Sequence, residues 1–320
     1  MERKESPGSK GFTNYAWIFL VYMLGVILFG AWVRITGSGA GCGAHWPTCH
    51  GEIIPRDPSM ETIIEFTHRL TSGFLGLMTI VLVGWAWKLF GKHPVFWASG
   101  ITAIFIIFES LIGAGIVLAE LVADDDSVAR AIVIAIHLVN TLILTGATAL
   151  MAWWSTGRAL PSWERKTSLT WLLLLGIFGL IATSMSGAVT ALGDTLFPVD
   201  PTIGDGLFAR LRDDLSPANH FLVRLRIFHP VIAIVVAAYL MVVTWVIQVK
   251  DVPKQIDFWS SMTLGLVIFQ TLIGFVNIML GAPGWIQLVH LLFAQLLWIA
   301  VLLLTMSTMM PLEEREEGLP

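Results

Sequence analysis

The stretch Glu65-Phe66-Thr67-His68-Arg69 decides the fold, because it places a carboxylate, an imidazole and a guanidinium at the start of an apolar segment that continues to Phe90. Glu65 and His68 are three residues apart, so they share one face of a helix. Ionisable groups at membrane depth are costly and mark functional sites. Three more histidines lie near the start of a long apolar segment, namely His137, His229 and His290.

The composition indicates a polytopic membrane protein. Of the 320 residues, 56% are hydrophobic and 13% charged, whereas soluble domains carry about 25% charged residues. The net charge of −4 and the lack of a basic stripe argue against nucleic-acid binding. The apolar run from Tyr15 resembles a signal peptide, but it is long enough to span and has no clear cleavage site, so we predict a retained helix.

Eight segments have the roughly 20 mostly apolar residues that a spanning helix needs. They cover residues 15–33, 62–90, 95–122, 130–156, 167–192, 221–249, 258–280 and 286–310. All seven lysines lie in, or next to, one alternating set of connections, and the long loops 34–61 and 193–220 belong to the other set. The positive-inside rule therefore predicts cytoplasmic termini and external long loops.

The two halves of the sequence repeat. Glu109-Ser-Leu-Ile-Gly113 matches Gln270-Thr-Leu-Ile-Gly274 at an offset of 161 residues, and His68 and His229 have the same offset. Each half starts inside and has four spans, so the halves have parallel orientation. We predict an all-α membrane protein of two four-helix bundles, formed by residues 1–157 and 158–320.

With this orientation, all four histidines lie in one layer. Each is near the outer start of its segment, about 10 Å deep at 1.5 Å per residue. Two histidines that face each other across a four-helix bundle suit axial ligation of a haem iron. The haem propionates need cationic partners, for which the sequence offers Arg69, Arg130, Arg224 and Arg226. Helix-packing histidines and a proton relay remain the alternatives, but a relay would string residues through the membrane.

Glu65 distinguishes the halves, because Arg226 stands at the matching position of the second half. This asymmetry predicts a reactive site in the first half and a supporting cofactor in the second. The alternative is a Glu65–Arg69 helix pair. A di-iron bundle needs two Glu-x-x-His pairs and two further glutamates, and the chain has one such pair.

Cys42 and Cys49 lie in the first external loop. The oxidising environment there favours a disulfide, which in so short a loop is expected to be strained or exposed and redox-active. His45 and His50 leave a Cys2His2 metal site as an alternative. Glu109 lies in mid-span and is expected to be protonated or hydrogen-bonded within its bundle.

These pieces together resemble haem A synthase, the membrane enzyme of cytochrome oxidase assembly. The matching residues are Arg34-Ile-Thr-Gly-Ser-Gly39, the Cys42/Cys49 loop with Trp46-Pro47, Glu65-Phe-Thr-His68-Arg69, His137, His229-Pro230, Gln270-Thr-Leu-Ile-Gly274 and His290. The resemblance covers nearly the whole chain. Two departures are Gly43-Ala44-His45, where the family pattern has Pro-Asp, and Glu109, where it has Gln.

The resemblance implies a role for each of these residues. His229 and His290 would bind a permanent haem b, and His68 and His137 would hold the substrate haem O. Glu65 would be an essential catalytic residue, and Cys42 and Cys49 a disulfide in substrate handling or electron transfer. The implied reaction oxidises the C8 methyl group of haem O to the formyl group of haem A in the bacterial inner membrane. Haem O synthase and cytochrome oxidase assembly proteins would be partners, and a homo-oligomer is left open.

Three other functions share some of these features. A di-haem electron-transfer cytochrome would explain the histidines but not the one-sided position of Glu65. A haem transporter would need a polar path through the cytoplasmic halves of the spans, which the sequence does not show. A purely structural assembly factor would not require four membrane histidines.

Overall fold

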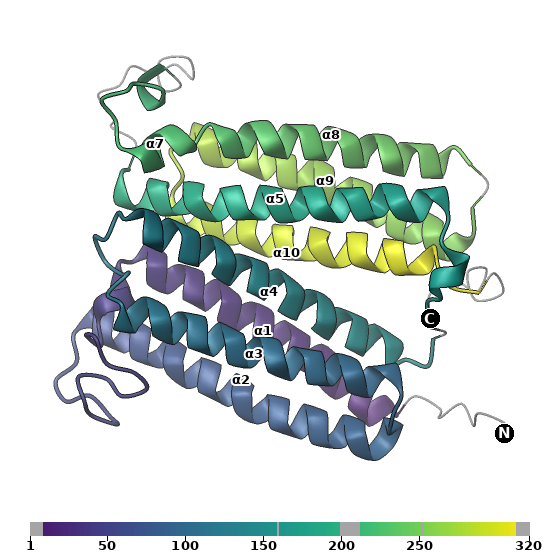
Figure 1. Cartoon of the computed structure of the whole chain (residues 1–320), viewed down its shortest axis with the longest axis horizontal. Coiled ribbons are helices and arrows are strands. Elements are labelled where there is room, and N and C mark those ends of the chain that lie inside the picture. The colour runs from purple at the N-terminus through teal and green to yellow at the C-terminus, as the bar shows by residue number, and fades with distance from the viewer. Residues whose placement is uncertain (1–8, 159, 199–211, 251, 312–320) are drawn as a thin grey trace.

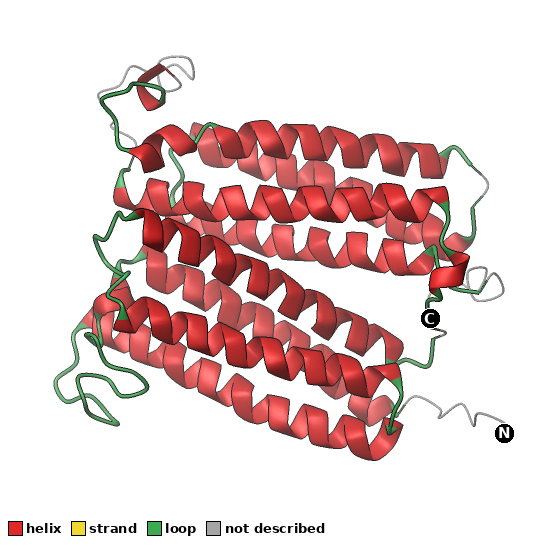
Figure 2. Ribbon diagram, viewed as in Figure 1, coloured by secondary structure: helices red, strands yellow, loops and turns green. Residues whose placement is uncertain are grey.

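The computed structural model describes residues 9–158, 160–198, 212–250 and 252–311, and within these ranges the chain forms helices and no strands (Figures 1 and 2). The long helices are α1 Lys10–Ile35, α2 Met60–Phe90, α3 Pro94–Leu118, α4 Val128–Trp154, α5 Ser168–Leu196, α8 Phe228–Gln248, α9 Lys254–Met279 and α10 Gly284–Ser307; the shorter ones are α7 Phe221–Leu225 and the 3₁₀ turns η1 Ser38–Ala40 and η2 Trp163–Arg165. Eight helical segments are long and apolar enough to cross a membrane, with α7 and α8 counted as one. The eight predicted segments are therefore confirmed.

Local sequence signals set the helix ends. Ser59 precedes α2, and its hydroxyl accepts the backbone N–H of Thr62 at 3.2 Å. Ser127 caps α4 in the same way through Arg130 N–H at 3.1 Å. Such caps satisfy N–H groups that a helix start leaves without partners. Gly91 directly follows the end of α2, and its positive φ of 56° suits a residue without a Cβ.

The sixth predicted segment, 221–249, contains a break that the hydropathy did not reveal. α7 ends at Leu225 and α8 begins at Phe228. Pro230 has no N–H to donate to the carbonyl of Arg226, four residues earlier, so a continuous helix would lack that bond. Pro230 instead lies in the first turn of α8, where a proline costs little. The break places His229 at the beginning of α8.

The helices form two groups of four. Figure 1 shows α1–α4 together on one side and α5, α8, α9 and α10 on the other. α4 packs against α5 and α10 where the groups meet. The indole N–H of Trp298 in α10 donates to the carbonyl oxygen of Leu142 in α4 at 2.7 Å. A Cβ on Gly146 of α4 would lie 2.7 Å from a side-chain carbon of Leu302, so this glycine permits the close approach.

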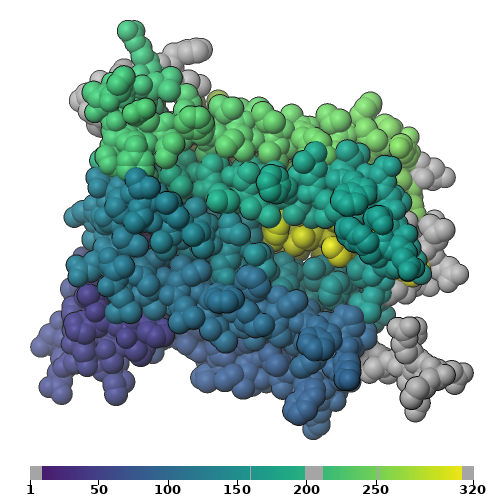
Figure 3. Space-filling model, viewed as in Figure 1, coloured from purple at the N-terminus to yellow at the C-terminus, as the bar shows by residue number. Residues whose placement is uncertain are grey.

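The helices run from one end of the molecule to the other. The start of α1 and the end of α10 lie at one end, and the loop between α1 and α2 lies at the other (Figure 1). Large apolar side chains such as Ile80, Trp87 and Trp97 are exposed along the outside, as expected where lipid covers a surface. Figure 3 shows α10 in yellow at the bottom of a hollow between the first four helices and α5. Residues of α3, α4 and α10 line an apolar pocket of about 260 Å³.

Candidate functional site

His229 of α8 and His290 of α10 face each other in the second group of helices. Their ring centroids are 6.3 Å apart, and the rings are nearly perpendicular, at 86°. Bonds between a metal ion and an imidazole nitrogen are about 2 Å long, so a metal between two imidazoles requires ring centres roughly 6 Å apart. The separation of the two rings therefore fits one iron ion between them.

The hydrogen bonds of His229 leave one ring nitrogen for a metal. Its Nδ1 lies 3.1 Å from the carbonyl oxygen of Thr183 and 3.2 Å from the hydroxyl of Ser186, both in α5. A carbonyl oxygen only accepts, so Nδ1 carries the proton and Nε2 keeps its lone pair. A backbone carbonyl that fixes the tautomer in this way is common behind metal-binding histidines.

Three of the four histidines lie against a glycine of a neighbouring helix. A Cβ on Gly30 would be 3.1 Å from the Cε1 atom of His68, and a Cβ on Gly274 would be 3.0 Å from that of His290. The corresponding distance from Gly187 to His229 is 2.9 Å. Any larger residue would push the ring aside. These glycines were not predicted from the sequence, although Gly30-Ala31 and Gly187-Ala188 offered a faint matching signal.

His68 of α2 and His137 of α4 both lie in the first group of helices. His137 is close enough to act electrostatically on His68, and the ring of Phe29 in α1 meets His68 edge to face at 5.6 Å. Nδ1 of His68, His137 and His290 is buried and makes no hydrogen bond. Buried polar atoms normally have partners, so these unpaired nitrogens fit histidines that serve a bound group.

Matching residues of the two halves contact His137 and His290. Oε2 of Glu109 lies 3.6 Å from Nδ1 of His137. Gln270, the counterpart of Glu109 in the repeat, places its amide nitrogen 3.3 Å from Nε2 of His290 and donates to the carbonyl oxygen of His290 at 3.1 Å. The expectation that Glu109 is hydrogen-bonded within its bundle is met by Asn140, whose amide nitrogen donates to the carboxyl group.

Both carboxylate oxygens of Glu65 accept hydrogen bonds, and the residue is 3% exposed. Arg69 donates to Oε1 at 2.5 Å, and the backbone N–H of Cys42 donates to Oε2 at 2.8 Å. Arg69 also donates to the carbonyl oxygens of His45 and Thr48, at 2.8 and 2.7 Å. The Glu65–Arg69 helix pair, the alternative that the sequence left open, is thus present. Glu65 and Arg69 also hold the cysteine loop against α2, one turn before His68.

The loop closes through a Cys42–Cys49 disulfide, as predicted. Its sulfurs are therefore not thiolate ligands, which removes the Cys2His2 alternative. In the described residues, no group of three or more His, Cys, Asp or Glu side chains is arranged around a common metal position.

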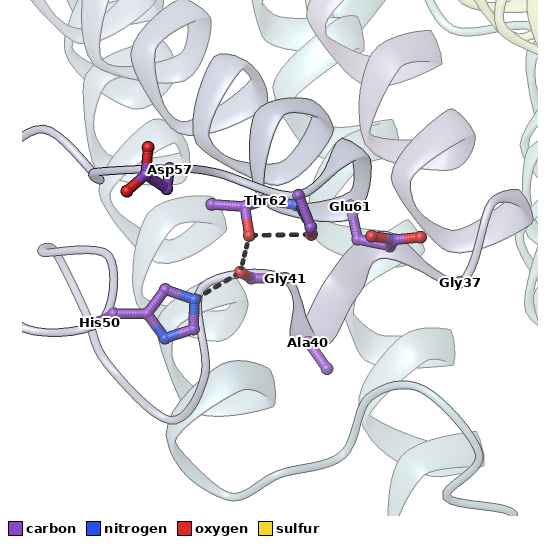
Figure 4. Close-up of a pocket in the computed structure, with 8 residues that line it drawn as sticks. Gly37, Ala40, Gly41, His50, Asp57, Glu61 and Thr62 are labelled. Carbon is purple, nitrogen blue, oxygen red and sulfur yellow. Dashed lines mark hydrogen bonds between the residues drawn. The ribbon is translucent and has the colours of Figure 1, made fainter.

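The loop lies directly on α2. A Cβ on Gly41 would be 2.4 Å from the backbone of Glu61, and the Thr62 hydroxyl donates to the Gly41 carbonyl oxygen at 2.6 Å. Figure 4 shows these residues and His50, whose Nε2 lies 2.9 Å from the same oxygen, around an open polar pocket of about 440 Å³.

Arg226 and Arg224, two of the arginines expected near the haem propionates, differ in burial and in their partners. Arg226 is buried and pairs with Asp194 at 3.0 Å and with Asp214 at 3.6 Å. Burial raises the pKa of Asp214 above its usual value, against the opposing effect of Arg226. Arg224 is exposed. Arg226 lies three residues before His229, and its guanidinium is already paired with two carboxylates.

Two further arginines lie where the helix groups meet. Arg34 of α1 donates to the carbonyl oxygen of Ala191 at 2.5 Å and to Oε1 of Gln287 at 3.0 Å, which connects α1 to α5 and α10. Arg130 is buried at the start of α4 and donates to carbonyl oxygens of the turn 123–125. Its Nε atom has no hydrogen-bond partner, so it retains a donor for an anion.

Eight helical segments long and apolar enough to cross a membrane define a multi-pass membrane protein. The model of the cytochrome oxidase assembly protein family matches residues 13–302, and the chain belongs to this family.

Curated relatives carry two different names. A protein of Thermus thermophilus named "Protoheme IX farnesyltransferase" is 43% identical over 310 residues, which make up 95% of this chain and 50% of the relative. The haem A synthase of Alkalihalophilus pseudofirmus is 50% identical over 104 residues, 32% of this chain and 35% of the relative. That of Halalkalibacterium halodurans is 50% identical over 96 residues, 30% and 32% of the respective chains. The chain spans about half the length of the Thermus relative.

Proposed function

We propose that the protein is a haem A synthase that oxidises the C8 methyl group of haem O to a formyl group. The observation that carries this proposal is the facing pair His229 and His290, at 6.3 Å, in a chain of the cytochrome oxidase assembly family that has a second histidine pair, His68 and His137, in its first half. The similarity to named haem A synthases supports it further.

In this proposal each half holds one haem. Residues 158–320 bind a resident haem b through His229 and His290, and residues 1–157 hold haem O through His68 and His137. The halves form a parallel repeat with both termini in the cytoplasm. Two observations support the repeat: glycines lie against corresponding histidines, and Glu109 and Gln270 contact corresponding ones. The lysine distribution supports the orientation.

A haem supplies the redox power that an inert methyl C–H bond requires. The chain's own residues orient the substrate and respond to charge. Glu65 is the proposed catalytic residue, because it is the buried carboxylate one turn before His68. Its two oxygens accept hydrogen bonds from Arg69 and Cys42 N–H, and its proposed role is to accept a proton or to stabilise positive charge as the methyl group loses electrons. The Cys42–Cys49 disulfide is proposed to act in substrate handling or electron transfer next to this carboxylate.

The proposal includes a haem O synthase as partner. In Thermus thermophilus, a sequence similar to this whole chain makes up half of a protein whose name is that of a farnesyltransferase. A single chain that unites the two would pass haem O directly from its formation to its oxidation. We propose that a haem O synthase supplies haem O to this chain and that assembly proteins of cytochrome oxidase receive the product.

The test is pigment extraction from cells that make haem O, with and without this protein. New haem A supports the enzyme. Unchanged haem O, together with two haems bound to the purified protein, would instead indicate the electron-transfer cytochrome.

A further inference from the structure

Arg130, near the start of α4, is a buried cation with an unused hydrogen-bond donor. The residue is 5% exposed. Its Nη1 atom donates to the backbone carbonyl oxygens of Ala123 and Asp125, at 2.7 and 2.6 Å, which fixes the guanidinium without neutralising it. Its Nε atom is buried and has no hydrogen-bond partner. The carboxylates of Asp124 and Asp125 act on it electrostatically from a more exposed turn, but among the described residues Arg130 forms no ion pair.

The other three arginines that the sequence offers to haem propionates are in different situations. Arg69 is paired with the carboxylate of Glu65, and Arg226 is paired with that of Asp194. Arg224 is exposed. In the part of the chain that the structure describes, Arg130 is thus the one of the four that is both buried and without a carboxylate partner. A buried cation of this kind is costly unless an anion pairs with it, so its environment points to an anionic ligand.

Arg130 lies on the same face of α4 as His137. The two residues are seven positions apart, which is close to two helical turns, and Arg130 lies about 10 Å nearer to the start of the helix. Figure 1 shows that this start is at the same end of the molecule as the loop between α1 and α2. In the second half, Pro283 stands seven positions before His290. The buried cation therefore belongs to the first half alone.

We propose that Arg130 binds a propionate carboxylate of haem O in the first half. This inference rests on the proposed function, in which His137 is a ligand of that haem. A guanidinium N–H forms a charge-assisted hydrogen bond with a carboxylate, and such bonds are shorter and stronger than neutral ones. The two propionates are the carboxylate groups of haem O, so they are the part of the substrate that a buried guanidinium recognises.

The position of the propionate determines where the reacting methyl group lies. The C8 methyl group and one propionate are substituents of the same pyrrole ring. Two axial histidines leave the macrocycle free to rotate about the axis through the iron, and a carboxylate held by Arg130 removes this freedom. Holding a substrate in one orientation is a large part of enzymatic rate enhancement. Arg130 is therefore a substrate-binding residue that orients haem O for reaction at C8.

A comparison of haem O with its propionate dimethyl ester tests the inference. The ester keeps the iron, the macrocycle and the apolar tail, but its propionates carry no charge. Each compound is titrated into the purified full-length protein with its resident haem in place, and the dissociation constant is read from the change in visible absorption. We expect the wild type to prefer haem O over the ester by roughly tenfold to a hundredfold, as for a hydrogen bond between charged groups.

The variants of Arg130 should change this preference selectively. Arg130→Gln is expected to bind haem O as weakly as the ester, with its affinity for the ester unchanged. Arg130→Lys keeps the charge but not the geometry of the guanidinium, so its preference should lie between those of the wild type and Arg130→Gln. Arg224→Gln removes an exposed arginine and should keep the full preference.

The other results would overturn the inference. Equal affinities of the wild type for haem O and the ester would mean that Arg130 holds a different anion, such as a lipid phosphate, and would leave the proposed function standing. An equal loss of both affinities in Arg130→Gln would show a structural role. If Arg130→Gln does not fold, Arg130→Lys decides: a selective loss of affinity for haem O supports the inference, and an unselective loss or none contradicts it. A wild type that binds neither compound contradicts the proposed function as well.

Discussion

Arg34 of α1 donates a hydrogen bond of 3.0 Å to Gln287 of α10, so the end of the first long helix is fixed to the start of the last. The same guanidinium donates to the carbonyl oxygen of Ala191 and to the hydroxyl of Thr195 in α5. One side chain of the first half thus contacts two helices of the second. Arg34, the first residue of the motif Arg34-Ile-Thr-Gly-Ser-Gly39, therefore connects the two halves of the protein.

We predict that Arg34→Ala destabilises the contact between the halves. Loss of the guanidinium leaves Oε1 of Gln287 in α10 without its donor, and an unsatisfied buried group of this kind costs about 1–3 kcal/mol. Thermal unfolding in detergent should show a lower midpoint temperature for Arg34→Ala than for Arg224→Ala, which removes an exposed arginine. Equal unfolding temperatures of the two variants would argue against this role.

We predict that Gly187→Ala weakens haem binding in the second half. The added Cβ would lie 2.9 Å from Cε1 of His229, so the imidazole ring must move away from its position opposite His290. Changes next to metal ligands lower affinity by about 10–100-fold. Haem titration of the apoprotein measures the effect. Gly265→Ala is the matched control, because no atom lies within 4 Å of its added Cβ. Equal affinity of the two variants would contradict the steric argument.

Glu65→Gln should abolish haem A formation while both haem sites remain filled. The amide keeps the size of the side chain but loses its charge and one acceptor, so it cannot satisfy both Arg69 and Cys42 N–H. Product analysis and haem content measured on the same preparation separate the two effects. Normal turnover would remove Glu65 from the proposed mechanism.

The cysteine loop should depend on its disulfide for activity and not for haem b binding. Neither cysteine is free, so maleimide should label the protein only after reduction. The Cys42→Ser/Cys49→Ser variant is expected to make less haem A and to retain its second-half haem, because the loop lies on α2 of the first half. Loss of the second-half haem in this variant would show that the loop serves the fold as a whole.

Much of the fold follows from hydropathy. The eight spans were predicted to within a few residues, apart from the start of α1, because long apolar runs leave little choice. The break between α7 and α8 was not, since Pro230 acts through a single missing hydrogen bond within an apolar run. The disulfide was predicted from the external position of Cys42 and Cys49.

The site was harder to predict than the fold. The four histidines stand out because an imidazole in an apolar segment is rare. The glycines beside them, the connection of Glu65 to Cys42 and the contacts of Arg34 depend on which residues of distant helices meet. The period of a single helix says which face a residue occupies, but not what lies opposite. These features therefore appeared only with the structure.

We propose that paired histidines hold a haem in each half, and haem analysis of purified His229→Ala and His68→Ala decides whether they do. We expect His229→Ala to lose the resident haem b while its first half stays folded, and His68→Ala to keep that haem. If His229→Ala retained haem b at the wild-type level, the assignment of the second-half site would be wrong.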